Sequence, residues 1–191
     1  MRAPAHHRYT WEQYLQLERQ SPIKHEFLDG EIFAMAGGTP EHAALGATVL
    51  RDLGVQLKGT PCRAYSSDLS VKIQSSGLAT YPDASVLCGE PRSDPGSPNV
   101  VLNPTVLVEV TSDSTESYDR GEKFEHYRGI PELAEYVLVS HRERLIEVFR
   151  RGAEGLWTRF EARRGARVRL ESIACELEVD SIYEGITLHT E

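Results

Sequence analysis

The sequence lacks long hydrophobic runs, and this shortage excludes a membrane-spanning helix. Its apolar runs fall far short of the roughly 20 residues that a membrane-spanning helix needs. The N-terminus, Met-Arg-Ala-Pro-Ala-His-His-Arg, does not contain the apolar core of a secretion signal. We therefore expect a cytoplasmic protein with no membrane partner.

Cysteine is scarce as well, and only Cys62, Cys88 and Cys175 are present. Their number is odd, their positions are widely separated, and none belongs to a CxxC motif. Disulfide frameworks and thiolate zinc sites normally use even sets or closely spaced pairs of cysteines. The pattern disfavours both, and we expect buried free thiols.

Positive charge is also in short supply, because 21 Lys and Arg stand against 29 Asp and Glu, for a net charge of −8. Such a protein is poorly suited to strong nonspecific binding of a polyanion. Residues 141–170 are the exception, with nine Arg, four Glu and a local net charge of +5. This stretch is either a surface that faces phosphate or the solvated side of a strand meander. The nine are Arg142, Arg144, Arg150, Arg151, Arg159, Arg163, Arg164, Arg167 and Arg169.

The bulk composition suits one folded unit. With 191 residues and 40% hydrophobic content, the chain can bury one core, and its length favours a single domain over residues 1–191 with a small C-terminal extension. Thr10 and Gln13 have the spacing of a capping box at the start of a short helix. Asp29-Gly30 between two apolar runs predicts a hairpin turn. Thr39 precedes Pro40 and should cap a core helix that ends near Gly59.

The rest of the chain alternates strand and helix signals. Residues 63–73 and 81–88 read as two adjacent strands, and 89–103, rich in Pro, Gly and Ser, as a surface loop. Residues 105–111 form an almost continuous apolar run that is typical of a central strand, and 114–129 should be one helix. The remaining predicted strands are 135–140 and a meander over 144–150, 157–162 and 167–170.

Two carboxylates lie on or beside predicted buried strands, Asp83 after Pro82 and Glu109 inside the central run. Desolvating an ion in such a place costs several kcal/mol unless it is paired. Two acids that share a divalent cation offset this cost, and hard oxygen ligands suit Mg²⁺ or Mn²⁺. Because strand side chains alternate with a period of two, Asp83 and Glu109 can converge if their strands are neighbours.

Lys123 completes the pattern on the following helix. Asp119, Lys123 and Tyr127 are spaced i, i+4 and i+8, so they share one stripe, and the first two can form an ion pair. In metal-dependent cleavage of a phosphodiester, acids hold the cation while a Lys orients or activates the attacking water and offsets developing charge. The pattern therefore favours a metal-dependent phosphodiesterase site.

Each residue also has a plainer interpretation. Asp83 alone is typical of a turn or a strand start, and Glu109 alone could form a core-edge salt bridge with Lys123 or Lys72. We interpret His42 as a polar residue of a first helical turn more readily than as a ligand. Asp68 could support the site, or it could have only a structural role in a strand bulge or a hydrogen bond. Tyr127 should pack beneath Lys123 without acting in catalysis.

Several motifs together resemble the Uma-two family of restriction endonucleases, within the PD-(D/E)xK superfamily. The resemblance covers about residues 9–187, nearly the whole chain. The matching segments are Phe27-Leu-Asp-Gly-Glu31, Ser67-Asp68-Leu69, Tyr81-Pro-Asp83, Val108-Glu-Val-Thr-Ser112 with Ser114-Thr115, Tyr118-Asp-Arg-Gly-Glu-Lys-Phe-Glu-His-Tyr127, and Tyr183-Glu-Gly.

The resemblance implies an α/β restriction-endonuclease-like fold, with a mixed central sheet flanked by helices, an N-terminal hairpin and a C-terminal strand meander. It implies Asp83 and Glu109 as metal ligands, helped by the main-chain carbonyl of Val110. The superfamily often has its Lys two residues after the Glu. That position is Thr111 here, so the role passes to Lys123.

It also implies an extra acidic residue near the metal, for which Glu26 is the candidate and Glu31 its competitor. The function implied is hydrolysis of DNA phosphodiester bonds by a Mg²⁺- or Mn²⁺-dependent endonuclease. Cutting both strands with one site per chain would favour a homodimer with two-fold symmetry. Two alternatives stay open: a noncatalytic binding or regulatory module with a nuclease fold, associated with a mobile element, and a hydrolase of a small phosphorylated metabolite, which suits the net charge better.

Overall fold

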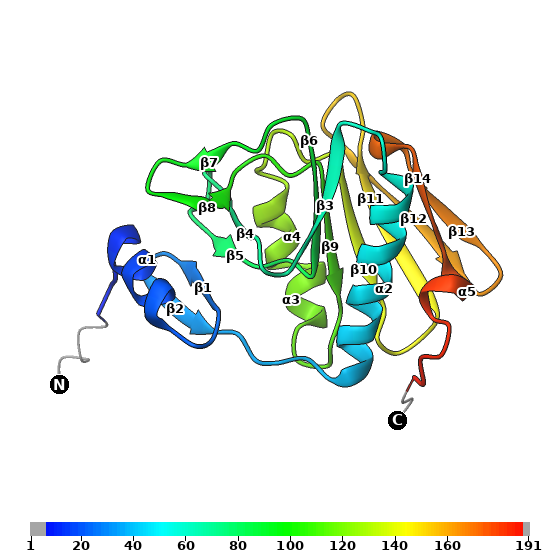
Figure 1. Cartoon of the computed structure of the whole chain (residues 1–191), viewed down its shortest axis with the longest axis horizontal. Helices are drawn as coiled ribbons and strands as arrows, with labels where there is room; N and C mark the ends of the chain where they lie inside the picture. The colour runs from blue at the N-terminus through cyan, green and yellow to red at the C-terminus, as the bar shows by residue number, and fades with distance from the viewer. Residues whose placement is uncertain (1–6, 189–191) are drawn as a thin grey trace.

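The computed structural model describes residues 7–188 and contains two six-stranded sheets, a two-stranded sheet and a small number of helices (Figure 1). This mixture of helices and mixed sheets confirms the predicted α/β class. Within residues 7–188, no helix has the length and apolar character needed to cross a bilayer.

One sheet contains the strands that carry Glu109 and follow Asp83. In spatial order its strands are β12 (Trp157–Arg163), β11 (Leu145–Arg151), β10 (Glu135–Val139), β9 (Val106–Val110), β6 (Ala84–Cys88) and β3 (Cys62–Ser66). β9 and β10 are parallel, and the other neighbours are antiparallel. Both β9 and β10 are buried along their whole length, as a central strand requires.

The second sheet carries the N-terminal hairpin. Its order is β2 (Glu31–Ala34), β1 (His25–Leu28), β5 (Ala79–Thr80), β4 (Ser70–Lys72), β8 (Ser97–Val101) and β7 (Ser93–Asp94). Asp29 and Gly30 both have positive φ, 52° and 81°, at the turn between β1 and β2. This confirms the hairpin, because two left-handed residues match the twist of the flanking strands.

The helices are short apart from one. They are α1 (Trp11–Gln20), α2 (Pro40–Gln56), α3 (Glu116–Arg120), α4 (Glu122–Tyr127), the 3₁₀ turn η1 (Glu171–Ile173) and α5 (Val179–Ile182). Thr10 and Gln13 form the predicted capping box of α1, and Thr39 caps α2 through the His42 amide. The start of α2, which positions His42, was therefore correctly predicted.

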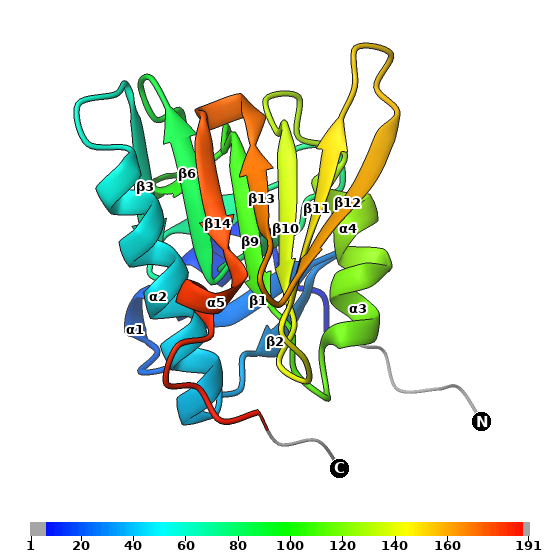
Figure 2. The same cartoon turned by 90° about the vertical axis from the view of Figure 1, so that its right-hand side faces the viewer.

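Two helical layers cover opposite faces of the sheet around β9 (Figure 2). From α2, Leu45 and Val49 share one core cluster with Val108 and Val110. From α4, Phe124 and Tyr127 belong to a second cluster with Leu107, Tyr136 and Leu138. Alternate residues of β9 thus face different helices, and Glu109 lies on a strand enclosed from both sides.

The predicted single helix over 114–129 is wrong, because the chain breaks between α3 and α4. Gly121 is both the C-cap of α3 and the N-cap of α4. A side chain there would meet the Ser117 carbonyl, since a Cβ would lie 3.1 Å from that oxygen. The sequence pattern has no signal for the break other than this glycine.

Two further predictions need correction. The predicted strand over 63–73 is split into β3 and β4, which belong to different sheets. The predicted loop over 89–103 contains β7 and β8, and β8 pairs in parallel with β4. The many turn-forming residues at 89–99 predict a loop and outweigh the signal of the short apolar segment that follows them. In that segment Val100 and Val101 are buried.

The C-terminal part is close to the predicted meander. β11 and β12 are antiparallel, whereas β13 (Arg167–Leu170) pairs with β14 (Cys175–Glu178) in a separate two-stranded sheet. Many arginines of this region face carboxylates: Arg142 with Asp113, Arg150 with Glu135, Arg159 with Glu147, Arg163 with Glu143 and Arg167 with Glu176. These ion pairs favour the meander interpretation over a dedicated phosphate-facing surface.

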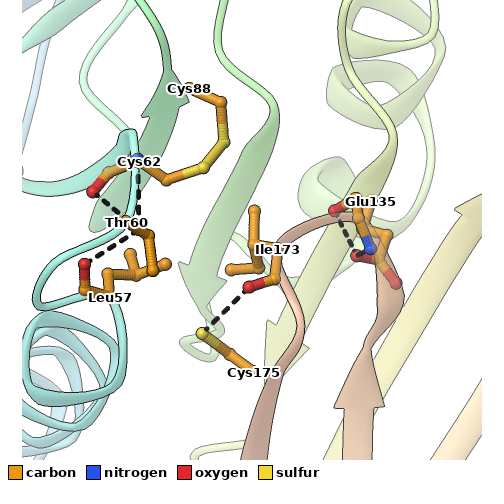
Figure 3. Close-up of a disulfide and its surroundings, with 8 residues drawn as sticks. Leu57, Thr60, Cys62, Cys88, Glu135, Ile173 and Cys175 are labelled. Carbon is orange, nitrogen blue, oxygen red and sulfur yellow. Dashed lines mark hydrogen bonds between the residues drawn. A yellow bond between two sulfur atoms is a disulfide. The ribbon is translucent and has the colours of Figure 1, made fainter.

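The expectation of three free thiols is wrong, because Cys62 and Cys88 form a disulfide (Figure 3). They are 26 residues apart and lie directly opposite each other in the antiparallel register of β3 and β6. Cysteine number and spacing cannot show such a pairing, since it depends on strand register. Cys175 is free and buried, as expected, and its thiol donates to the Ile173 carbonyl at 3.5 Å.

Candidate active site

Strand register brings the two predicted metal ligands to the same place. In the antiparallel pair of β6 and β9, Ala84 lies opposite Val108. Asp83, immediately before β6, therefore lies beside the end of β9 that carries Glu109. The two carboxyl groups are near enough that the charge of Asp83 contributes to raising the pKa of Glu109. The predicted convergence of these side chains is consistent with this geometry.

Lys123 of α4 lies among three carboxylates. Its Nζ is 2.9 Å from Glu109 Oε1, 3.2 Å from Glu26 Oε1 and 3.7 Å from Asp119 Oδ1. The last contact is the predicted i, i+4 pair. The Lys123 and Glu109 side chains are each only 6% exposed, so this cluster is shielded from water. Three acids around one ammonium leave an excess of negative charge in a buried place.

Burial and neighbouring charges shift the titration of these groups. Burial raises the pKa of Glu109 to about 8, against the opposing effect of the Lys123 charge, and Asp83 and Asp119 add to the rise. Burial also raises the pKa of Asp119. Burial alone would lower the pKa of Lys123, but the charges of Glu109, Glu26 and Asp119 outweigh this and raise it. The lysine is therefore an ammonium at neutral pH.

Glu26 is the acidic residue of the hairpin that reaches this cluster. It lies on β1, and its Oε1 contacts both Lys123 and the Thr80 hydroxyl. Glu31 is exposed at the start of β2, opposite Leu28. Geometry therefore favours Glu26 over Glu31 as the supporting acid.

Asp83, Val110 and His42 form a second group at the same strand ends. The Val110 amide donates to Asp83 Oδ2 at 2.7 Å. His42 Nε2 lies 2.9 Å from the Val110 carbonyl oxygen and 3.5 Å from Asp83 Oδ2. His42 comes from α2 on one face of the sheet, whereas Lys123 comes from α4 on the other.

Other predicted residues have separate partners. Thr111 places its hydroxyl 2.8 Å from His141 Nδ1. Lys72 pairs with Asp94 at 2.8 Å, so it is Lys123 that contacts Glu109. Asp68 forms an exposed pair with Lys24 at 2.8 Å, which favours its plainer interpretation.

Tyr127 donates a hydrogen bond of 2.6 Å to Glu109 Oε1. This contact restrains the carboxylate, and it agrees with a packing role for the ring, which is fully buried. Tyr127 therefore contacts Glu109 from the buried core, and its lack of a catalytic role stays a prediction.

The oxygen atoms present fit a hard divalent cation. Asp83, Glu109 and the Val110 carbonyl offer only oxygen, which Mg²⁺ and Mn²⁺ prefer. Within residues 7–188, no group of three or more His, Cys, Asp or Glu side chains is arranged to hold a metal ion, so the candidate ligands are two carboxylates and one main-chain carbonyl. Mg²⁺ is usually held by one or two carboxylates together with water and substrate phosphate, so this sparse set is suitable.

Two residues near the site have no clear signal in the sequence. The position of His42 predicts a polar residue of a first helical turn, but its ring reaches Val110 and Asp83. Thr80 belongs to none of the predicted site motifs, but its hydroxyl contacts Glu26. The Thr39 cap and Pro40 locate His42 on its helix, but only the packing of α2 on the sheet reveals what the ring touches.

Known proteins resemble this chain over most of its length. The family model of Uma2, described as "Putative restriction endonuclease", matches residues 11–181. Two uncharacterized proteins of Synechocystis sp. are similar: slr1290 is 38% identical over 92% of this chain and 91% of its own length, and sll1609 is 33% identical over 78% and 84%.

A solved structure shares the fold. The crystal structure of a protein from Anabaena variabilis, described as "a putative nuclease belonging to DUF820", superposes with a TM-score of 0.74 at 17% identity, covering 92% of this chain and 98% of that one. At this identity the likeness shows a shared fold alone. Because the family model spans nearly the whole chain, the protein belongs to the Uma2 family of restriction-endonuclease-like proteins.

Proposed function

We propose that this protein is a Mg²⁺- or Mn²⁺-dependent endonuclease that hydrolyses DNA phosphodiester bonds. The observation that carries the proposal is the buried excess of acid: Glu26, Glu109 and Asp119 surround the single ammonium of Lys123, with Asp83 beside Glu109. A stable fold does not require such an arrangement, because apolar residues would fill the space at lower cost. Membership of the Uma2 family supports the same function.

The proposed metal ligands are Asp83, Glu109 and the Val110 carbonyl. A divalent cation bound there would polarise the phosphate and neutralise charge that develops on its oxygens. Glu26 and Tyr127 hold Lys123 and Glu109 in place through their contacts of 3.2 Å and 2.6 Å. The Lys123 ammonium then orients the attacking water and offsets negative charge on the phosphate.

In this hydrolysis a water oxygen bonds to phosphorus and loses one proton to solvent, the bond from phosphorus to the leaving sugar oxygen breaks, and the leaving oxygen takes up a proton from solvent. One chain offers one such site, so cutting both DNA strands would use a homodimer. Many arginines of the C-terminal meander are paired with carboxylates. We therefore expect groups near the site, and not these arginines, to make the specific contacts with DNA.

The direct test is plasmid nicking by the purified full chain in Mg²⁺, Mn²⁺ or EDTA. We expect metal-dependent nicking that Asp83→Ala and Glu109→Ala abolish, and that Lys123→Ala lowers with metal affinity less affected. Glu26→Gln should lower the rate roughly tenfold or more, and Glu31→Gln is the matched control that should not. Equal activity in every variant would indicate a contaminating nuclease.

A noncatalytic module with the same fold is the second candidate. The net charge of −8 and the ion-paired arginines are the observations that favour it. It predicts metal-independent partner binding and no nicking of plasmid or single-stranded DNA under any metal condition.

A further inference from the structure

We propose that His42 is a positioning residue of this site: its imidazole fixes the Val110 carbonyl and the Asp83 carboxylate as a pair of cation-facing oxygens. The inference rests on the proposed function and adds a residue to it. His42 acts through two other groups, and nothing in its geometry requires contact with substrate.

The first support is the closed set of contacts at the end of β9. Both polar groups of the Val110 main chain have a partner: the amide donates to Asp83 Oδ2 at 2.7 Å, and the carbonyl oxygen lies 2.9 Å from His42 Nε2. Donation to a carbonyl requires the proton on Nε2, which fixes the tautomer. His42 Nε2 is also 3.5 Å from Asp83 Oδ2, so the same ring nitrogen lies close to both oxygens.

The second support is the space kept for the ring. A Cβ on Gly38 would lie 2.7 Å from His42 Nδ1 and 3.0 Å from Cγ, closer than atoms can pack. The adjacent Gly37 has nothing within 4 Å of a Cβ. Of two neighbouring glycines, only Gly38 must lack a side chain for His42 to hold its place.

A carbonyl oxygen has two lone pairs, so His42 can occupy one while the other faces a cation. Groups that orient metal ligands in this way contribute strongly to affinity, because a free ligand must be ordered when the metal binds. The helix cap does not depend on the ring, since Thr39 accepts from the main-chain amide of His42. Removing the imidazole should therefore leave α2 intact.

The test is the Mn²⁺ dissociation constant of the full chain, measured by isothermal titration calorimetry. We expect His42→Ala to weaken binding about 10- to 100-fold, and His42→Gln, whose amide N–H can reach the same carbonyl, to stay within about threefold of the wild type. Gly38→Ala should displace the ring and weaken binding about tenfold, whereas Gly37→Ala should bind as the wild type does. Urea unfolding in EDTA shows that each variant is folded.

Two outcomes separate this inference from the proposed function. If the wild type binds Mn²⁺ and Asp83→Asn does not, but His42→Ala and Gly38→Ala bind as tightly as the wild type, the role of His42 is overturned and the metal site stands. If the wild type binds no Mn²⁺, or Asp83→Asn binds it equally well, the proposed site is overturned together with this inference.

Discussion

The ion pairs of this chain differ sharply in their exposure to water, and this exposure decides how much each pair contributes to the free energy of unfolding. Lys24 with Asp68 and Lys72 with Asp94 both have N–O distances of 2.8 Å. The Asp68 side chain is 85% exposed, whereas Asp94 is 8% exposed. Asp94 also accepts from Trp11 Nε1 and the Gly96 amide, which ties α1 to the second sheet.

We expect Asp94→Asn to lower the free energy of unfolding by about 2 kcal/mol or more at neutral pH, because it weakens a buried pair. The matched change Asp68→Asn should cost less than about 1 kcal/mol, since water screens that pair. Urea titrations of both variants measure the difference. Equal costs would show that burial does not strengthen the Asp94 pair.

The loss of unfolding free energy caused by Asp94→Asn should depend on pH. Burial alone would raise the pKa of Asp94, but hydrogen bonds from Lys72, the Gly96 amide and Trp11 outweigh it and lower the pKa below the ordinary value of 3.8. Its stabilising effect is therefore fully present above that value and is lost as the pH falls through the lowered pKa. The difference between wild type and Asp94→Asn should shrink below about pH 4.

At the scale of elements, the β1–β2 hairpin carries Glu26 to Lys123, and its turn depends on left-handed backbone. Gly30 has φ of 81°, and a Cβ there would lie 3.0 Å from Arg8 Cβ. Gly30→Ala should therefore lower the free energy of unfolding by about 1 kcal/mol or more. Gly37→Ala, in open space, is the control and should be close to neutral. An unchanged unfolding midpoint for Gly30→Ala would contradict this account of the turn.

Elements with a local signal could be predicted from the sequence. The capping box at Thr10, the Asp29-Gly30 turn and the Thr39-Pro40 start of α2 each depend on neighbouring residues, and each is confirmed. The break at Gly121 could not be predicted, because a single glycine inside a helical pattern has several outcomes.

The site residues also differ in whether a local sequence signal identifies them. Asp83 and Glu109 can be found in the sequence because they are charges beside or inside apolar runs, and Lys123 because of its i, i+4 spacing from Asp119. The contacts of His42 and the choice of Glu26 over Glu31 depend on packing between distant segments, and Cys62 with Cys88 on strand register. No local pattern encodes them.

At the scale of the molecule, one covalent link joins β3 to β6, the strand that follows Asp83. Closing a loop of 26 residues restricts the unfolded chain. We expect reduction by dithiothreitol to lower the free energy of unfolding by about 3 kcal/mol. Cys175→Ser should keep this response and the Cys62→Ser/Cys88→Ser double variant should lose it. A wild type that unfolds identically with and without reductant would contradict the link.

The central claim is that Asp83 and Glu109 share a cation. Without one, the charge of Asp83 disfavours ionisation of Glu109 and contributes to its raised pKa. Asp83→Asn removes one charge at nearly constant shape, so in EDTA it should be more stable than the wild type. With metal bound, the wild type should be more stable than Asp83→Asn, because only the wild type keeps both acidic ligands.

Mn²⁺-dependent stabilisation of the wild type and Asp83→Asn, measured by thermal and urea unfolding, tests this claim most directly. At about 100 times its dissociation constant, Mn²⁺ should stabilise the wild type by roughly 2.7 kcal/mol. Asp83→Asn should show none of this stabilisation. A wild type without a metal response, or an Asp83→Asn variant that keeps the whole response, would contradict the account.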